Sequence, residues 1–236
     1  SVAESGDEPL MLARQVPKAV VCVSPDRYLA GTLAEQQLGC TMHILDDGFQ
    51  HLELARSLDV LVTTLGEIPN GRVMPMGRLR EPRDAAARAH FLVVSDATAR
   101  AAQAGAWAFG IQQACGAART LAAPVPAVPG VPDVPNGKVL AVAGIAHPQR
   151  FFDALKAQWN LVQTIAFADH HRYMAVDIAA IDAKVKASGA DAVFMTDKDA
   201  VRLEGLSLPF AAYRVPLLVE FDPPEALRQS VMAVLQ

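Results

Sequence analysis

The run Ile44–His51 contains side chains that can bind a metal ion or an anion. Asp46 and Asp47 are adjacent carboxylates, and the apolar segment Met42–Leu45 before them predicts a buried parallel strand. Gly48 permits a sharp turn just past that strand. Because adjacent carboxylates repel, a Mg²⁺ ion held by them and by substrate phosphates is one way to stabilise the pair. The pattern predicts a metal-handling turn at the end of a strand, and a plain acidic turn is the alternative.

Two polar residues and one arginine extend this prediction to the substrate. Gln50 and His51 follow the acidic pair within reach of whatever it holds. Arg27 opens a predicted helix directly after Lys18–Val23, a β-branched apolar run that predicts another strand. A guanidinium at the carboxyl end of a strand can clamp phosphate, whereas a solvated arginine at the start of a helix is the simpler interpretation.

The loop Gly66–Pro82 is long for an α/β connection, and such loops are often functional. Asn70, Arg72, Arg78 and Arg80 stand in it among glycines and prolines. Several guanidiniums in a conformationally restricted loop favour anion recognition, and a solvated basic loop remains the alternative.

A further acid–base candidate lies in Asp169-His170-His171, at the end of the predicted strand Leu161–Phe167. Adjacent histidines on one loop rarely face the same ion, so we expect an acid–base role for one of them. A structural histidine pair is the alternative. Asp7 precedes the predicted helix Leu10–Arg14, where an acidic residue suits the positive end of the helix dipole.

Composition limits the class of protein. The chain has 236 residues, of which 52% are hydrophobic and 19% charged, so a substantial core is possible. The net charge of −4 shows no global basic signature, and we expect no nucleic-acid partner. Three scattered cysteines, without a C-x-x-C pair, predict neither a disulfide framework nor a zinc site. We expect neither a transmembrane helix nor a signal peptide in this sequence.

Alternating strand and helix patterns predict an α/β fold with two domains. Residues 1–121 are expected to form the first, 122–137 a proline-rich linker, and 138–236 a smaller α/β domain. The other expected strands are Leu58–Thr64, Phe91–Ser95, Trp107–Ile111, Lys138–Ala143, Asp191–Met195 and a pair within Tyr213–Phe221. The other expected helices run from Asp26 to about Gln37 and over Pro148–Lys156, Asp177–Ala187 and Pro223–Leu235, with Thr196 as the N-cap of one more.

These motifs, in this order, resemble the tetraacyldisaccharide 4′-kinase family, the lipid A 4′-kinases. In the first part they are Gly6-Asp7-Glu8-Pro9, Asp26-Arg27, Asp46-Asp47-Gly48-Phe49-Gln50-His51, Asn70-Gly71-Arg72 and Leu79-Arg80-Glu81-Pro82. In the second part they are Ala143-Gly144-Ile145, Phe151-Phe152, Phe167-Ala168-Asp169-His170-His171 and Met195-Thr196-Asp197-Lys198-Asp199-Ala200-Val201. The resemblance covers nearly the whole chain.

The resemblance implies transfer of the ATP γ-phosphate to the 4′-hydroxyl of a tetraacyldisaccharide 1-phosphate, at the cytoplasmic face of the bacterial inner membrane. It implies a P-loop-NTPase-like, mostly parallel first sheet and a smaller α/β second domain. Asp46 and Asp47 match the acidic pair that handles Mg²⁺, and Asp7 and His170 match a catalytic acid–base pair. The positions that match substrate contacts are Arg27, Gln50, His51, Asn70 and Arg80.

One departure from the family pattern is large. No Walker A loop of the G-x-x-x-x-G-K-[ST] type occurs in the chain, and neither does the hydrophobic segment that opens the family's sequences. We expect a fragment of a longer kinase. The alternatives are a non-catalytic relative that binds the lipid sugar phosphate, or a phosphotransferase acting on a soluble substrate.

Overall fold

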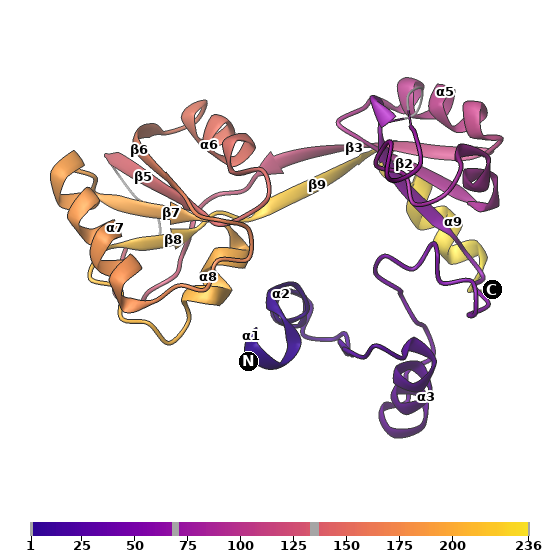
Figure 1. Ribbon diagram of the computed structural model, residues 1–236, viewed down its shortest axis with the longest axis horizontal. Helices are drawn as coiled ribbons and strands as arrows, with labels where there is room; N and C mark the ends of the chain where they lie inside the picture. Colours follow the sequence, from indigo (N-terminus) through magenta and orange to yellow (C-terminus); the bar gives the residue numbers. More distant parts are fainter. Residues whose placement is uncertain (1, 68–70, 133–136, 236) are drawn as a thin grey trace. The chain divides into compact units, whose positions relative to one another are not determined.

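The computed structural model describes residues 2–67, 71–132 and 137–235. Contacts divide the chain into two compact units (Figure 1). Unit 1 contains Ser1–His43 and Leu121–Leu217, and unit 2 contains Ile44–Thr120 and Leu218–Gln236. Both units therefore combine segments that are distant in the sequence, unlike the contiguous domains expected above. The division into folding domains at 121 and 138 stays a prediction.

Unit 1 is built on a five-stranded sheet of order β4-β8-β7-β5-β6. Strand β5 pairs in parallel with β6 and β7, β7 pairs in parallel with β8, and β4 joins the edge antiparallel to β8. The strands are β4 (Val125–Pro126), β5 (Lys138–Ala143), β6 (Asn160–Ala166), β7 (Ala192–Met195) and β8 (Ala212–Arg214). The expected strands in this part of the chain are confirmed.

Helices cover both faces of this sheet (Figure 1). Val139 and Ala141 of β5 pack on the side of α6 (Pro148–Lys156), while Leu140 and Val142 pack on the side of α7 (Ala175–Ser188). All four side chains are completely buried. Strand β5 can therefore be apolar at every position after Lys138, as strands of covered parallel sheets are.

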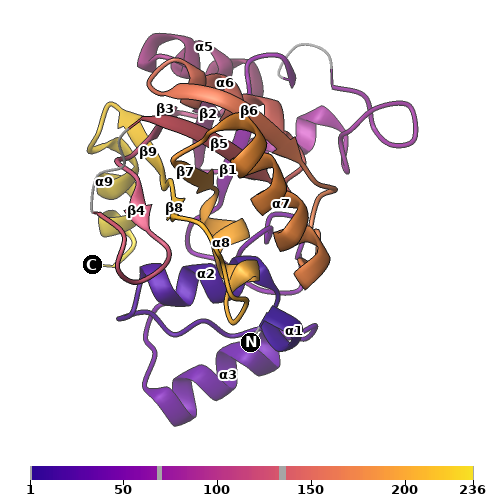
Figure 2. The ribbon, with the colours of Figure 1, turned by 90° about the vertical axis from the view of Figure 1, so that its left-hand side faces the viewer.

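The first residues of the chain add three helices to unit 1, namely α1 (Val2–Ser5), α2 (Asp7–Gln15) and α3 (Arg27–Leu38). Asp26 caps α3, since its side chain accepts a hydrogen bond of 2.9 Å from the amide of Leu29. Helix α2 packs against α8 (Asp197–Leu203), as Figure 2 shows. The expected helices at Leu10–Arg14 and after Asp26 are confirmed.

Unit 2 contains a four-stranded sheet of order β1-β2-β3-β9. Its strands are β1 (Val60–Thr64), β2 (Phe91–Ser95), β3 (Gln113–Leu121) and β9 (Leu217–Asp222), and β2 runs parallel to both β1 and β3. Side chains of β2 alternate between two clusters, one with α5 (Ala99–Phe109) and one with α9 (Ala226–Ala233). The 3₁₀ helix η1 (Arg83–Arg88) precedes β2.

Two expected strands, Lys18–Val23 and Met42–Leu45, are wrong. Both segments are irregular, and neither pairs with another strand among the residues that the structure describes. Ile44 is 86% exposed, so the apolar run before the acidic pair is not buried. An apolar run becomes a strand only where neighbouring strands supply hydrogen bonds and a second layer covers it.

The expected strand Trp107–Ile111 is also wrong, because Trp107 to Phe109 form the end of α5. Thr98 caps this helix, and Gly110 ends it in a left-handed conformation with φ 76°. Strand β3 was not predicted, since small residues such as Ala114 and Gly116 weaken its strand pattern. The pair expected within Tyr213–Phe221 is confirmed as β8 and β9, which lie in different sheets.

The proline-rich segment expected as a linker contributes β4 to the sheet of unit 1. An edge position suits Pro126, because proline lacks the N–H that a central strand must donate. The backbone carbonyl of Pro132 accepts a hydrogen bond of 2.9 Å from the hydroxyl of Tyr213. Residues 133–136 of the segment lie outside the described residues.

Candidate active site

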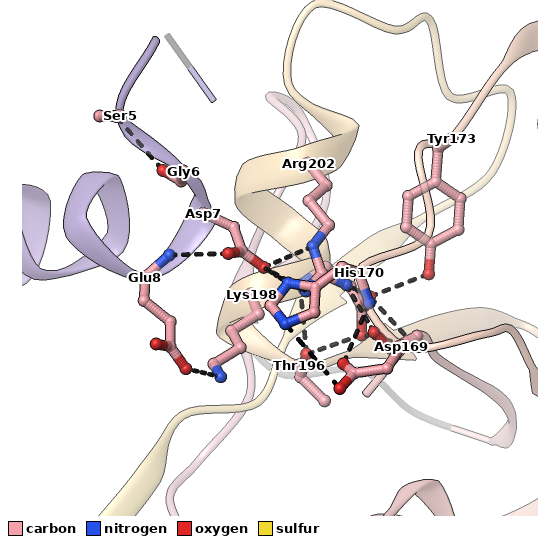
Figure 3. A network of polar contacts seen from close by, with 12 residues as sticks. Ser5, Gly6, Asp7, Glu8, Asp169, His170, Tyr173, Thr196, Lys198 and Arg202 are labelled. Carbon is pink, nitrogen blue, oxygen red and sulfur yellow. Dashed lines mark hydrogen bonds and ion pairs between the residues drawn. The ribbon is translucent and has the colours of Figure 1, made fainter. Parts of the chain in front are cut away.

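Asp7 and His170 face each other within unit 1 (Figure 3). Oδ2 of Asp7 lies 3.2 Å from Nδ1 of His170. Asp7 is the first residue of α2, after Gly6 with φ 85°, and His170 follows β6 in a left-handed conformation with φ 56°. That conformation is uncommon outside glycine, and a hydrogen bond of 3.0 Å from the His170 amide to the side chain of Asp169 accompanies it.

The pair consists of one buried and one accessible group. The side chain of Asp7 is 10% exposed, whereas that of His170 is 63% exposed. An ionised carboxylate only accepts hydrogen bonds, so the proton of a neutral ring in this contact belongs on Nδ1. Nε2 of His170 is then left with a lone pair that can take a proton. The arrangement suits an acid–base pair of the kind expected for these two residues.

Arg202 of α8 contacts both members of this pair. Its Nε donates a hydrogen bond of 2.7 Å to Oδ2 of Asp7, and its Nη2 donates to the same oxygen. Its Nη1 donates to the backbone carbonyl of Gly144 at 2.5 Å. The side chain is only 4% exposed. Arg202 was not among the predicted site residues, although its position three residues after Asp199 in a predicted helix was an available signal.

Asp199 lies at the centre of the buried network behind Arg202. Its carboxylate is completely buried and accepts hydrogen bonds from the amide of Gly144 at 3.1 Å and the hydroxyl of Tyr173 at 2.9 Å. Thr196, the N-cap of α8, donates its hydroxyl at 2.6 Å. Burial and the neighbouring Asp199 carboxylate raise the pKa of Tyr173, so this phenol stays protonated and a donor.

The electrostatic environment keeps Asp7 ionised. Burial acts to raise the pKa of Asp7, but hydrogen bonds and charge from Arg202 lower it. The amide of Glu8, which donates at 3.0 Å, and the charge of His170 add to this lowering. The net pKa of Asp7 lies below its usual value. The carboxylate is therefore a fixed negative charge beside the imidazole at neutral pH.

His171 points into a different set of contacts. Its Nε2 lies 3.1 Å from Oδ2 of Asp177, and its ring stacks on Phe167 with 4.5 Å between the ring centroids. Asp177 also accepts a hydrogen bond of 2.8 Å from the amide of Met174 at the start of α7. His171 therefore supports the start of a helix, while His170 is the histidine that meets Asp7.

Ion pairs at the surface link α2 to α8 as well. Lys198 pairs with Glu8, and Gln15 donates a hydrogen bond of 3.0 Å to Asp197. Arg214 of β8 binds the other oxygen of Asp197 at 2.8 Å. The contacts of Lys198 and Gln15 hold both ends of α2 against the first turn of α8, and Asp7 lies next to Arg202.

The acidic pair of unit 2 lies in an exposed turn. Asp46 is exposed, and Asp47 has a left-handed backbone with φ 50°. Oδ2 of Asp47 is 2.7 Å from Nη1 of Arg80, and both side chains are more than half exposed. The structure thus joins two motifs singled out in the sequence, and a guanidinium supplies counter-charge to the carboxylates.

Further contacts join the same two motifs. Arg88 binds the carboxylate of Glu81 through two nitrogens, at 2.8 and 3.0 Å, and its guanidinium lies 4.9 Å from the ring centroid of Phe49. The hydrogen bonds from Arg88 lead the effects that lower the pKa of Glu81, and Gln50 adds to this lowering. The pair of Arg88 and Glu81 therefore lies beside Phe49 of the acidic turn.

The remaining predicted site residues are not brought together by the side-chain contacts described above. The backbone carbonyl of His51 accepts a hydrogen bond from Arg56, which fixes the turn. Arg27 is exposed at the start of α3. Asn70 lies outside the described residues. Within the described ranges, no group of three or more histidine, cysteine, aspartate or glutamate side chains is arranged to hold a metal ion.

The described helices also include none with the length and apolar character that crossing a membrane requires.

Comparison with known proteins identifies the family. The family model described as tetraacyldisaccharide-1-P 4′-kinase, LpxK, matches residues 1–236. A tetraacyldisaccharide 4′-kinase of Geobacter metallireducens is 37% identical over 243 residues, covering 100% of this chain and 71% of the relative. The corresponding protein of Geobacter sulfurreducens is 38% identical, covering 86% of this chain and 58% of the relative.

The crystal structure of LpxK from Aquifex aeolicus in complex with ATP has the same fold. It matches with a TM-score of 0.76 and 26% identity, covering 100% of this chain and 71% of that chain. The expected P-loop-NTPase-like α/β class and the expected kinase class are thereby confirmed. The chain belongs to the tetraacyldisaccharide 4′-kinase family.

Proposed function

We propose that this protein, at the length its relatives have, transfers the γ-phosphate of ATP to the 4′-hydroxyl of a tetraacyldisaccharide 1-phosphate. The observation that carries the proposal is the buried Asp7 carboxylate held against the exposed ring of His170. The names of the relatives and the ATP complex of the Aquifex aeolicus protein support the choice of substrates.

In this proposal His170 takes the proton of the attacking hydroxyl. Its Nε2 is the basic atom of the pair, because Nδ1 faces Asp7, and Oδ2 of Asp169 lies 3.8 Å from Nε2. The Asp7 carboxylate fixes the ring orientation and balances the positive charge that the ring gains. General-base catalysis of this kind typically contributes about 10² to 10⁴ in rate. In phosphoryl transfer the protein contributes mainly by positioning the reactants and stabilising the developing charge.

We assign Asp46 and Asp47 to a Mg²⁺ ion that accompanies ATP. Their donor set fits this ion, since both carboxylates are exposed and Mg²⁺ commonly uses one or two carboxylates with substrate phosphates. The ion would neutralise charge on the transferring phosphate. Asp47 also binds Arg80 in the structure, so the same turn offers both a cation site and an arginine.

The substrate-side assignments extend from this turn. Arg80 is a phosphate clamp in the proposal, because its guanidinium is accessible and can use more than one N–H. Arg27, Gln50, His51 and Asn70 are the further substrate contacts. An acceptor that carries four acyl chains resides in a membrane, so we place the protein at the cytoplasmic face of the bacterial inner membrane, where ATP is available.

Transfer of radiolabel from ATP tests the proposal. The protein at full relative length is given the tetraacyldisaccharide 1-phosphate, or a water-soluble disaccharide 1-phosphate without acyl chains. We expect labelled lipid and little labelled soluble sugar. Transfer to the soluble sugar alone would indicate a different phosphotransferase, and binding of the lipid without turnover would indicate a non-catalytic relative.

A further inference from the structure

Arg202 is a buried cation of unit 1, and hydrogen bonds restrict both edges of its guanidinium. Its side chain is 4% exposed and lies between two carboxylates, the nearly buried Asp7 and the completely buried Asp199. A guanidinium removed from water is costly unless it is paired and hydrogen-bonded. Arg202 meets this requirement through Asp7, Asp199 at 3.3 Å and the carbonyl of Gly144.

The two edges of the guanidinium have different partners. Nε and Nη2 bind a single oxygen of Asp7, while Nη1 binds Gly144 and Asp199. Nη2 also lies 3.4 Å from Nδ1 of His170. Asp199 is itself fixed by three other donors of the buried network, from Gly144, Tyr173 and Thr196. The guanidinium therefore cannot turn without breaking buried hydrogen bonds. These hydrogen bonds connect the core of unit 1 to Oδ2 of Asp7, the Asp7 oxygen that contacts His170 (Figure 3).

We infer that Arg202 is a positioning residue for phosphoryl transfer: it holds Asp7 as a carboxylate with Oδ2 directed at Nδ1 of His170. The inference rests on the proposed function and deepens it. Arg202 does not touch the substrate in this account, and it acts through the Asp7–His170 pair. A lysine could supply the charge but not the planar fork that binds Asp7 and Gly144 together.

A purely structural role is the competing explanation, in which Arg202 only ties α8 to α2. The two roles differ in their effect on protonation. The titratable and charged groups around Asp7 are Glu8, Asp169, His170, Lys198, Asp199 and Arg202. Arg202 is the cation among them that binds Asp7 directly, so its removal favours the protonated form of the Asp7–His170 pair.

The experiment compares Arg202→Met, Arg202→Lys and the control Arg214→Met in the protein at full relative length. Arg214 also pairs with an aspartate of α8, at 2.8 Å, but contacts neither Asp7 nor His170. Rates with saturating ATP and acceptor are measured from pH 5 to 9, together with KM for ATP and thermal unfolding. For Arg202→Met we expect a fall in kcat of about tenfold or more and an acidic limb moved to higher pH.

For Arg202→Lys we expect lower kcat with an acidic limb near that of the wild type, because the charge remains. Arg214→Met is expected to keep the wild-type pH profile. An Arg202→Met enzyme with the wild-type pH profile, altered only in thermal unfolding, would overturn the inference. It would show that Arg202 only stabilises the packing of α8 against α2. If Arg202→Met does not fold, Arg202→Lys still tests the inference. This variant keeps the positive charge, so an acidic limb at clearly higher pH than in the wild type would also overturn it.

Failure of the proposed function itself is recognised separately. Asp7→Asn and His170→Ala are assayed beside the Arg202 variants. If those two changes leave kcat unchanged, the acid–base pair is not catalytic, whatever Arg202 does. If they lower kcat while the Arg202 variants retain wild-type rates and pH profile, only the positioning role is wrong.

Discussion

Oδ2 of Asp7 lies 3.2 Å from Nδ1 of His170, although 163 positions separate the two residues in the sequence. The contact forms inside one compact unit, where α2 packs against α8 and the loop after β6 reaches the same place. A carboxylate and an imidazole at this distance, one buried and one accessible, are the elements of a proton-transfer site.

The first prediction concerns the pH dependence of stability. The pKa of Asp7 is lowered in the folded protein, so its carboxylate stabilises the fold fully above the unfolded pKa of about 3.9. That contribution is lost as the pH falls through the folded value. Asp7→Asn also removes one of the two carboxylates that pair with Arg202, and we expect a loss of about 3 kcal/mol in the free energy of unfolding at pH 7.

Urea denaturation at pH 7 and at acidic pH checks this. The difference between wild type and Asp7→Asn should shrink as the pH falls below about 4, because the unfolded wild type then binds a proton at Asp7 before the folded protein does. A difference of the same size at both pH values would show that the charge of Asp7 does not contribute.

The second prediction concerns Asp199, which accepts hydrogen bonds from several groups while completely buried. Asp199→Ala removes those acceptors and leaves Arg202 with less counter-charge, so we expect a loss of about 3–5 kcal/mol. Asp182→Ala is the control, because Asp182 only forms an i,i+4 pair with Lys186 and should cost about 0.5 kcal/mol or less. Equal effects on the denaturation midpoint would refute a special role for the buried network.

The third prediction concerns the acidic turn. Asp47→Asn removes one negative charge from the proposed Mg²⁺ site and from the contact with Arg80. We expect kcat to fall by about 10² or more, as for loss of other electrostatic groups, with a higher Mg²⁺ requirement. Asp84→Asn changes another exposed carboxylate of unit 2 and should leave both quantities near normal. Near-normal turnover of Asp47→Asn would remove the acidic pair from the mechanism.

Local sequence patterns were enough to predict many of the helices and strands. Lys138–Ala143 is apolar nearly throughout and forms a buried strand, and Thr196 and Asp26 cap helices where the pattern indicates. These features depend on residues close together in the chain. The same signals failed at Met42–Leu45, since a strand also needs a partner strand that no local pattern guarantees.

The site was predictable in its parts and not in its assembly. The residues alone indicated that Asp169-His170-His171 could supply an acid–base group, and the family resemblance named Asp7 as the partner. Nothing local could place Arg202, because its burial depends on how α8 packs against α2. Arg80 was predicted as an anion clamp, and its ion pair with Asp47 is a long-range contact that spacing does not reveal.

The most direct test of the account is kcat for His170→Ala beside kcat for His171→Ala, in the protein at full relative length. His170 contacts Asp7, whereas His171 contacts Asp177 and supports the start of α7. We predict that His170→Ala lowers kcat by about 10² to 10⁴ with KM for ATP nearly unchanged, and that His171→Ala mainly lowers thermal stability. A His170→Ala enzyme with near wild-type kcat, or a larger loss of kcat in His171→Ala, would contradict the central claim that the Asp7–His170 pair accepts the proton of the hydroxyl.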